Sequence, residues 1–361
     1  MWKNLFATTP GIIIVGAVIG LIAVWLQKLG NPANMGICVA CFERDVAGGL
    51  GLHRAAIVQY LRPEIMGLVL GSLAAAIATR EFKPRGGSAP IVRFVLGMIA
   101  AMGALVFLGC PWRAILRLAG GDGNAILGLA GLATGIWFGT LFFKKGYSLG
   151  RSNSQSVVSG ALFPVIAVCL LLLYLIFPQI PDQPQSGPLF YSVKGPGSQH
   201  APFIASLGLA FIIGIFAQRS RFCTMGAFRD LFLFRYTHLF LGLAAMFAAA
   251  FIANALTGGL KFGFEGQPVA HSDFLWNYLG MVTAGLAFAL AGGCPGRQLF
   301  MAGEGDSDAG IFALGMLVGA AMAHNLGTAS SGTGIGVYGM QATIIGFAVC
   351  LIIGFVHSKK A

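Results

Sequence analysis

About ten runs of roughly 20 apolar residues follow one another along the chain, and they constrain its fold more than any other feature. Four clear examples extend from Gly11 to Leu29, Gly123 to Phe143, Val157 to Phe177 and Val337 to Phe355. A helix needs roughly 20 residues to cross the hydrocarbon core of a bilayer. The runs lack the ~10-residue alternating segments of a membrane β-barrel. The sequence therefore predicts an all-α, polytopic membrane protein with about ten transmembrane helices.

The composition agrees with a membrane location. Of the 361 residues, 57% are hydrophobic and 10% are charged, whereas soluble domains carry about a quarter charged residues. The formal net charge is +11, but the lysines and arginines lie singly or in small groups between the apolar runs. Such a distribution reflects membrane topology, in which basic loops face the cytoplasm. We therefore expect membrane lipid around the protein and no nucleic acid partner.

Short polar segments lie between the expected spans. Spans are predicted at about residues 11–29, 63–79, 91–108, 123–143, 157–177, 201–218, 237–257, 274–292, 308–326 and 336–356. Segments rich in Cys, Gly and Arg cover about residues 33–46, 110–120, 221–234 and 294–304. Non-helical backbone at membrane depth has to be buried in protein or line a watery cavity. We expect these four segments to be short re-entrant helices.

Two cysteine motifs occur twice in the chain. The segment Gly109-Cys110-Pro111-Trp112-Arg113 recurs as Gly293-Cys294-Pro295-Gly296-Arg297, at an offset of 184 (294 − 110). Cys38 precedes Arg44-Asp45 with the spacing that separates Cys223 from Arg229-Asp230, at an offset of 185 (223 − 38). The chain therefore resembles one membrane unit that has been copied and fused.

An odd number of expected spans precedes the second copy, which then enters the membrane from the opposite side. The sequence thus predicts two inverted repeats, an architecture common among membrane carriers. The first membrane repeat is expected at residues 1–150 and the second at 201–361. A linking helix and a Pro/Gly-rich outer loop occupy residues 151–200 between them.

The Gly-Cys-Pro-x-Arg motif is typical of a helix N-terminus. Proline is favoured at the first helical position, so the cysteine becomes the residue that caps the helix. Unpaired N–H groups and the helix dipole at such an end attract anions. A thiol is a weak donor, and its polarizable sulfur matches a soft sulfur or selenium atom in a substrate. We predict a substrate-binding site comprising Cys110, Cys294, Cys223, Cys38, Arg113 and Arg297.

Alternatives remain open for these residues. The two arginines of the motif could instead anchor the chain at the membrane interface. A membrane thiol oxidoreductase that uses Cys38 and Cys41 is a second class of function, and a structural subunit is a third. The seven cysteines form no disulfide framework, and no cluster has the spacing of a zinc site. We expect no catalytic residue, metal, cofactor or enzymatic activity, and a packing role for Cys169 and Cys350.

Basic residues indicate the orientation. Lysine and arginine concentrate in the segments 80–93, 144–151 and 219–235, with Lys359-Lys360 at the end of the chain. In the expected topology all of these lie on one side, which is the cytoplasmic side by the positive-inside rule. We therefore expect cytoplasmic N- and C-termini, with the stretch 178–202 outside.

The same residues carry a resemblance to a known family. Over essentially its whole length the chain resembles the YeeE/YedE family of sulfur-compound (thiosulfate) transporters of bacterial inner membranes. The stretches that carry the resemblance are Gly109-Cys110, Arg221-Phe222-Cys223-Thr224-Met225-Gly226-Ala227-Phe228-Arg229-Asp230 and Ala291-Gly292-Gly293-Cys294. The Cys-x-x-x-Ala-Phe-Arg-Asp form is most similar to the YedE branch linked to selenium metabolism.

This resemblance implies an uptake transporter that passes a small anion along cysteine thiols. Cys110 and Cys294 would form the narrowest contacts, with Cys223 nearby, inside an hourglass of inverted repeats. A cytoplasmic sulfurtransferase-type (TusA-like) partner is also implied. The Cys38/Cys41 pair departs from simpler family members, so the substrate is either thiosulfate or a selenium species.

Overall fold

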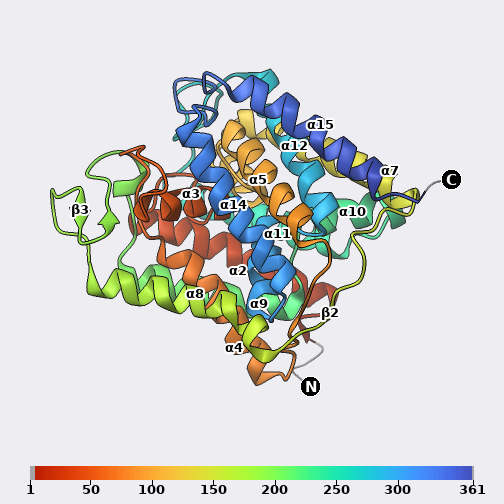
Figure 1. Cartoon of the computed structure of the whole chain (residues 1–361). Helices are drawn as coiled ribbons and strands as arrows, with labels where there is room; N and C mark the ends of the chain where they lie inside the picture. The colour runs from red at the N-terminus through yellow and green to blue at the C-terminus, as the bar shows by residue number, and fades with distance from the viewer. Residues whose placement is uncertain (1–4, 360–361) are drawn as a thin grey trace.

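The computed structural model describes residues 5–359 and is almost entirely helical (Figure 1). The long helices are α2 (Thr9–Lys28), α4 (Pro63–Ala78), α5 (Pro90–Phe107), α7 (Asn124–Lys144), α8 (Val157–Ile176), α9 (Phe203–Ser220), α11 (His238–Leu256), α12 (Phe274–Ala291), α14 (Ser307–Asn325) and α15 (Gly339–Val356). The short helices are α3 (Val39–Gly49), α6 (Pro111–Ala119), α10 (Thr224–Phe234) and α13 (Pro295–Gly303). Residues 1–4 and 360–361 lie outside the described range, and with them part of the predicted cytoplasmic termini, Lys360 included.

One small hairpin, one short sheet between distant segments and one 3-10 turn interrupt the helical pattern. Strands β1 (Arg85–Gly86) and β2 (Asn153–Ser154) pair antiparallel, and so do β3 (Gln185–Ser186) and β4 (Leu189–Phe190). The 3-10 turn is Pro196–Ser198. The sequence does not predict these strands, each of which is only two residues long.

The predicted polytopic all-α fold is confirmed. Within residues 5–359, nine segments are long and apolar enough to cross a membrane. In three of these the long helix and the short helix after it form one apolar segment, as in Pro90–Ala119. The tenth predicted span is α4, which is apolar but only 16 residues long. The chain is therefore a multi-pass membrane protein.

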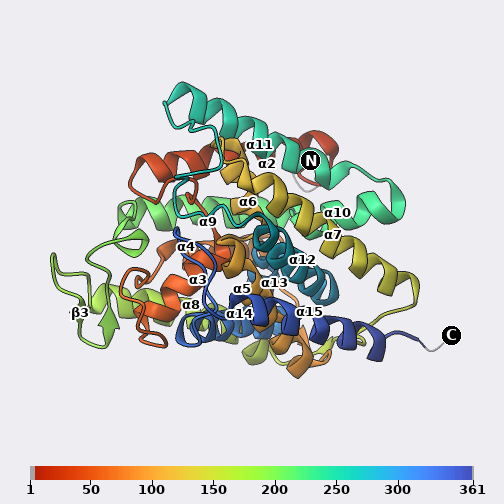
Figure 2. The ribbon, with the colours of Figure 1, turned by 90° about the horizontal axis from the view of Figure 1, so that it is seen from above.

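Helices from the two halves of the chain pack against one another in matching pairs. Helix α7 runs along α12, and α5 runs along α14. In the same way α2 packs on α11, and α4 packs on α9 (Figure 2). Each pair therefore joins one helix of the first half to one helix of the second.

Glycines allow these paired helices to approach one another closely. A Cβ atom on Gly131 would lie 2.2 Å from the carbonyl oxygen of Tyr278, and a Cβ atom on Gly315 would lie 2.2 Å from that of Phe94. The glycines are 184 residues apart (315 − 131), and so are the residues they contact (278 − 94). Small residues allow backbones in membranes to approach in this way. The same close approach thus occurs twice, with the roles of the two halves exchanged.

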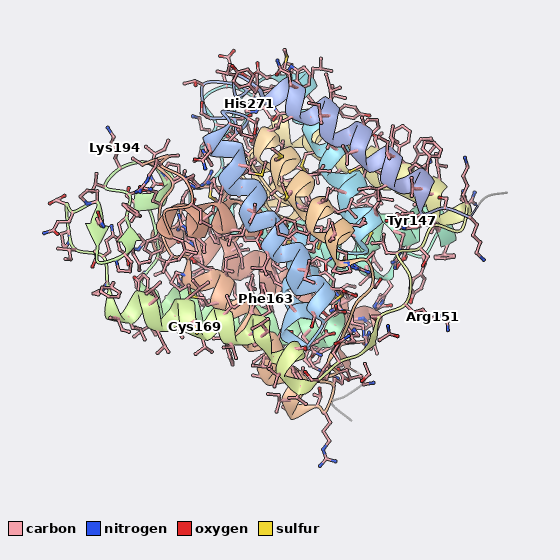
Figure 3. All side chains as sticks on the ribbon, viewed as in Figure 1. Tyr147, Arg151, Phe163, Cys169, Lys194 and His271 are labelled. Carbon is pink, nitrogen blue, oxygen red and sulfur yellow. The ribbon has the colours of Figure 1, made fainter. Side chains whose placement is uncertain are left out.

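Helix α8 lies at the edge of the bundle and is the least buried of the apolar segments, at 22%. Figure 3 shows Cys169 on its outer face, and this thiol is exposed. The expectation that Cys169 packs in the interior is therefore wrong, because α8 presents that side to the surroundings. Cys350 on α15 is fully buried, as expected.

Candidate functional site

Each of the four short helices begins directly after a cysteine. Cys110 caps α6 and Cys294 caps α13, with proline at the first helical position in both. Cys38 caps α3 and Cys223 caps α10. The capping position that the Gly-Cys-Pro-x-Arg motif predicts is therefore confirmed in both copies. The side chains of the other two cysteines also cap their helices. The Cys38 sulfur accepts a hydrogen bond from the Cys41 N–H at 3.4 Å, and the Cys223 sulfur accepts one from the Gly226 N–H at 3.3 Å.

The four capping thiols form two pairs. The thiols of Cys38 and Cys110 lie in hydrogen-bonding contact with each other, and the thiols of Cys223 and Cys294 do likewise. In each pair the thiol of the Cys-Pro motif also contacts the start of the facing helix, at Ala40 in α3 or at Thr224 in α10. Two helix N-termini therefore converge on each thiol pair, which concentrates partial positive charge around it.

The two Gly-Cys-Pro-x-Arg motifs lie at opposite ends of α5. Gly109 and Cys110 follow the last residue of this helix. Near its start, the Arg93 guanidinium donates to the carbonyl of Ala291, two residues before Gly293, at 3.0 Å. The two motifs therefore enter the interior from the two ends of this 18-residue helix.

Trp112 of the first motif contacts the second motif. Its ring packs 3.2 Å from where a Cβ atom on Gly296 would lie, and Gly296 is the equivalent position of the second motif. The same ring contacts Phe222, next to Cys223, with centroids 5.8 Å apart, and Phe300 of α13 at 5.9 Å. Trp112 is 1% exposed, and its indole Nε1–H is buried without a hydrogen-bond partner among the described residues. An unused donor therefore lies in the centre of the molecule.

The Arg113 guanidinium is fully engaged in this structure. It donates to the carbonyl oxygens of Asn34 at 3.3 Å, Pro268 at 3.3 Å and Val269 at 3.0 Å. It also donates to the Leu108 carbonyl and to the Cys41 sulfur, the latter at 3.4 Å. Arg113 thus ties three loops together over the first thiol pair, and these bonds have to break before it can hold an anion.

Arg297 is held less tightly. One guanidinium nitrogen lies 3.1 Å from a carboxylate oxygen of Glu304, and the residue is 8% exposed. The interface-anchor alternative fits neither arginine, because Arg113 is fully buried and Arg297 nearly so. Both are placed within the short-helix region, as the motif predicts.

The two Arg-Asp pairs differ in their surroundings. Asp45 accepts hydrogen bonds from Arg44 and, at 2.7 Å, from Arg62, and all three side chains are buried. Arg62 also donates to the carbonyls of Gln199 and Pro196, which ties the linker segment to α3. In the second copy Asp230 bonds only Arg229 among the described residues, and the arginine side chain is 37% exposed. The first thiol pair is therefore sealed more completely than the second.

The sequence reasoning missed several residues of this region. Arg117 and Asp122 form a fully buried ion pair at 2.6 Å, and Glu43 is buried in α3. One signal was available, because the two copies differ at several places in this region. Trp112 aligns with Gly296, Glu43 with Phe228 (43 + 185) and Arg117 with Met301 (117 + 184), whereas Asp122 matches Asp306 (122 + 184). Within residues 5–359 no group of His, Cys, Asp and Glu side chains could hold a metal ion.

The architecture defines a multi-pass α-helical membrane protein with a duplicated thiol site at short-helix N-termini. Residues 219–354 match the family described as "Sulphur transport". This match confirms, for that part of the chain, the resemblance to sulfur-compound transporters that the motifs predict.

A curated relative supports the same class. The protein named "Thiosulfate transporter TsuA", from Spirochaeta thermophila, is 32% identical to this chain over 106 residues. The aligned part is 29% of this chain and 32% of the relative, so the match spans about a third of the relative's length.

Proposed function

We propose that the protein is a bacterial inner-membrane uptake transporter for a small sulfur- or selenium-containing anion, with thiosulfate as the first substrate to test. The observation that carries the proposal is the pair of thiol sites, each at two converging helix N-termini. A helix N-terminus attracts anions through its N–H groups and dipole. The sulfur-transport match and the name of the relative support the substrate class.

The proposed path leads from the Cys38–Cys110 pair to the Cys223–Cys294 pair. Trp112 of the first motif contacts Gly296 of the second and offers an N–H donor that has no partner among the described residues. Weak thiol donors hold a soft anion briefly and release it quickly, which suits passage better than tight binding. In this structure the bonds of Arg113 close the first pair, and the path opens when they break.

The proposal includes inverted repeats at 1–150 and 201–361, for two reasons. The helix pairs exchange partners between the halves, and the two motifs stand at opposite ends of α5. Cytoplasmic termini follow from the basic segments. A cytoplasmic sulfurtransferase-type partner would receive the substrate, as the family resemblance implies.

Uptake by purified protein in liposomes tests the proposal. We expect ³⁵S-thiosulfate to enter protein-containing vesicles and not empty ones. Unlabelled thiosulfate and selenosulfate should compete, whereas sulfate should compete poorly because it lacks a soft terminal atom. Absence of uptake in intact, correctly folded vesicle preparations would contradict a transport function.

The alternative function is a thiol oxidoreductase, which one contact favours: the thiols of Cys38 and Cys41 lie in contact with each other. Such an enzyme would exchange electrons with a quinone or a partner thiol and would not move the labelled anion. The same vesicle experiment therefore separates the two functions.

Replacing Trp112 by phenylalanine tests the central donor. Phenylalanine keeps an aromatic ring against Gly296 but removes the N–H, so we expect the KM for thiosulfate to rise roughly tenfold, the effect of one hydrogen bond to a charged group. The comparison is Trp137→Phe, because Trp137 is 45% exposed on α7. Equal KM values for Trp112→Phe and the wild type would show that the indole N–H does not contact the substrate.

A further inference from the structure

Glu43 is a buried acid without a partner. It lies in α3, five residues after Cys38, and is 4% exposed. Its Oε2 atom is buried and has no hydrogen-bond partner in the part of the chain that the structure describes. No cation within residues 5–359 forms an ion pair with Glu43. Burial away from water is the one influence on this carboxyl group, and it opposes ionisation. The first membrane half thus contains a carboxyl group that the thiol path does not explain.

The charged groups around α3 are committed elsewhere. Arg44 and Asp45, the next residues, bond each other, and Arg62 bonds Asp45. Helix α3 packs against α4, α5, α13, α14 and β4. Their titratable side chains are Glu64, Arg93, Arg297, Asp308 and His324. The Oε1 atom of Glu64 accepts from Asn31 and Ser206, Arg93 donates to Ser88 and Ala291, Arg297 pairs with Glu304, and Asp308 accepts from Gly87 and Ser88. The His324 ring stacks on His53, while its Nε2 atom has no hydrogen-bond partner among the described residues. None of these groups compensates a charge on Glu43.

An ionised carboxylate in such a place is strongly unfavourable. Taking an isolated charge out of water costs far more than folding can supply, so a buried acid without a partner takes up a proton instead. In this packing Glu43 is a neutral carboxylic acid. Ionisable residues placed this way in membrane proteins are commonly parts of proton pathways.

We propose that Glu43 is the proton-binding site of the transporter and that one proton moves with each anion. The inference rests on the proposed transport function and adds its energy source. The O–H bond of Glu43 forms with a solvent proton on the side where the anion enters, and it breaks on the side where the anion leaves. Only the first repeat supplies such a site, because Phe228 occupies the equivalent position (43 + 185).

The position of Glu43 couples the proton to the anion. Five residues of helix separate it from Cys38 by about 7.5 Å along the axis. At about 8 Å and an effective dielectric constant near 20, a carboxylate would weaken anion binding roughly 30-fold. Coupling between two binding sites is reciprocal, so a bound anion strengthens proton binding at Glu43 by the same factor.

A pH gradient across vesicles tests this coupling. With the membrane potential clamped at zero and one pH unit more acid outside, we expect wild-type protein to accumulate ³⁵S-thiosulfate roughly tenfold, the equivalent of one proton per anion. Glu43→Gln keeps the shape of the neutral acid. It should still equilibrate the anion between the two sides, but without accumulation and with an uptake rate independent of pH.

Glu64→Gln is the matched control. Glu64 is also buried and its Oε2 atom also lacks a partner among the described residues, but its Oε1 atom accepts hydrogen bonds from Asn31 and Ser206 that glutamine can also accept. This variant should accumulate the anion as the wild type does. Loss of the gradient response in Glu64→Gln but not in Glu43→Gln would overturn the proposal, and so would wild-type uptake that ignores the gradient. If the wild type does not equilibrate the anion at all, the transport function itself fails.

Discussion

Replacing Cys110 or Cys294 by alanine is expected to reduce the rate of anion uptake roughly 100-fold or more. Loss of one preorganised hydrogen-bond donor lowers the rate of an enzyme by a similar factor. Each cysteine caps a short helix and contacts the thiol of its neighbour and the N-terminus of the facing helix. Alanine leaves that position without a donor. Uptake of ³⁵S-thiosulfate into vesicles measures the effect, and size-exclusion chromatography in detergent shows whether the variants still fold.

Cys350→Ala is the control, since Cys350 is as deeply buried but lies in α15 away from the short helices. Its uptake should match the wild type. Serine at Cys110 or Cys294 should keep part of the rate, because a hydroxyl preserves the donor but lacks the polarizability of sulfur. If the serine variants were as inactive as alanine and the wild type required an oxidised thiol, a redox mechanism would replace the donor model. Normal uptake by both alanine variants would show that the two thiols only fill space in the protein interior.

Asparagine at Asp45 is expected to lower the free energy of unfolding by about 3–5 kcal/mol. Asp45 bonds both Arg44 and Arg62, and all three side chains are buried. Removing its charge leaves two guanidinium groups uncompensated away from water, which is the costly way to break a buried pair. A fall in the midpoint of thermal unfolding in detergent, relative to the wild type, measures the loss.

The second copy provides the matched control. Asp230→Asn removes the equivalent charge from a pair in which the Arg229 side chain is 37% exposed, and exposed pairs contribute less than about 1 kcal/mol. Its unfolding midpoint should therefore change little. Similar shifts for the two variants would show that Asp45 is not the centre of a sealed ion network.

The fold was predictable from the sequence because the bilayer demands long apolar helices. Each of the ten predicted spans corresponds to a helix whose ends differ by a few residues, as for 123–143 and Asn124–Lys144. The short helices were predictable for a local reason. Proline after cysteine specifies a capped start, and the structure has that start at Cys110 and Cys294.

The partners of the site residues were not predictable, because they come from distant parts of the chain. Besides the neighbouring Leu108, the Arg113 guanidinium donates to the carbonyls of residues 34, 268 and 269, and no spacing in its own motif indicates these distant loops. Arg62 completes the Asp45 network from outside the repeated motif. Glu43 and Glu64 are both buried, and no motif in the sequence indicates either of them.

The exchange of helix partners between the halves has a consequence for assembly. Gly131 needs the backbone at Tyr278, and Gly315 needs the backbone at Phe94, so neither half contains the surface on which its own helices close. The first half made alone would lack α14 and α12, the helices on which α5 and α7 pack. The two halves are then better regarded as covalently joined subunits than as independent domains, and the linker segment (residues 151–200) sets their stoichiometry at one to one.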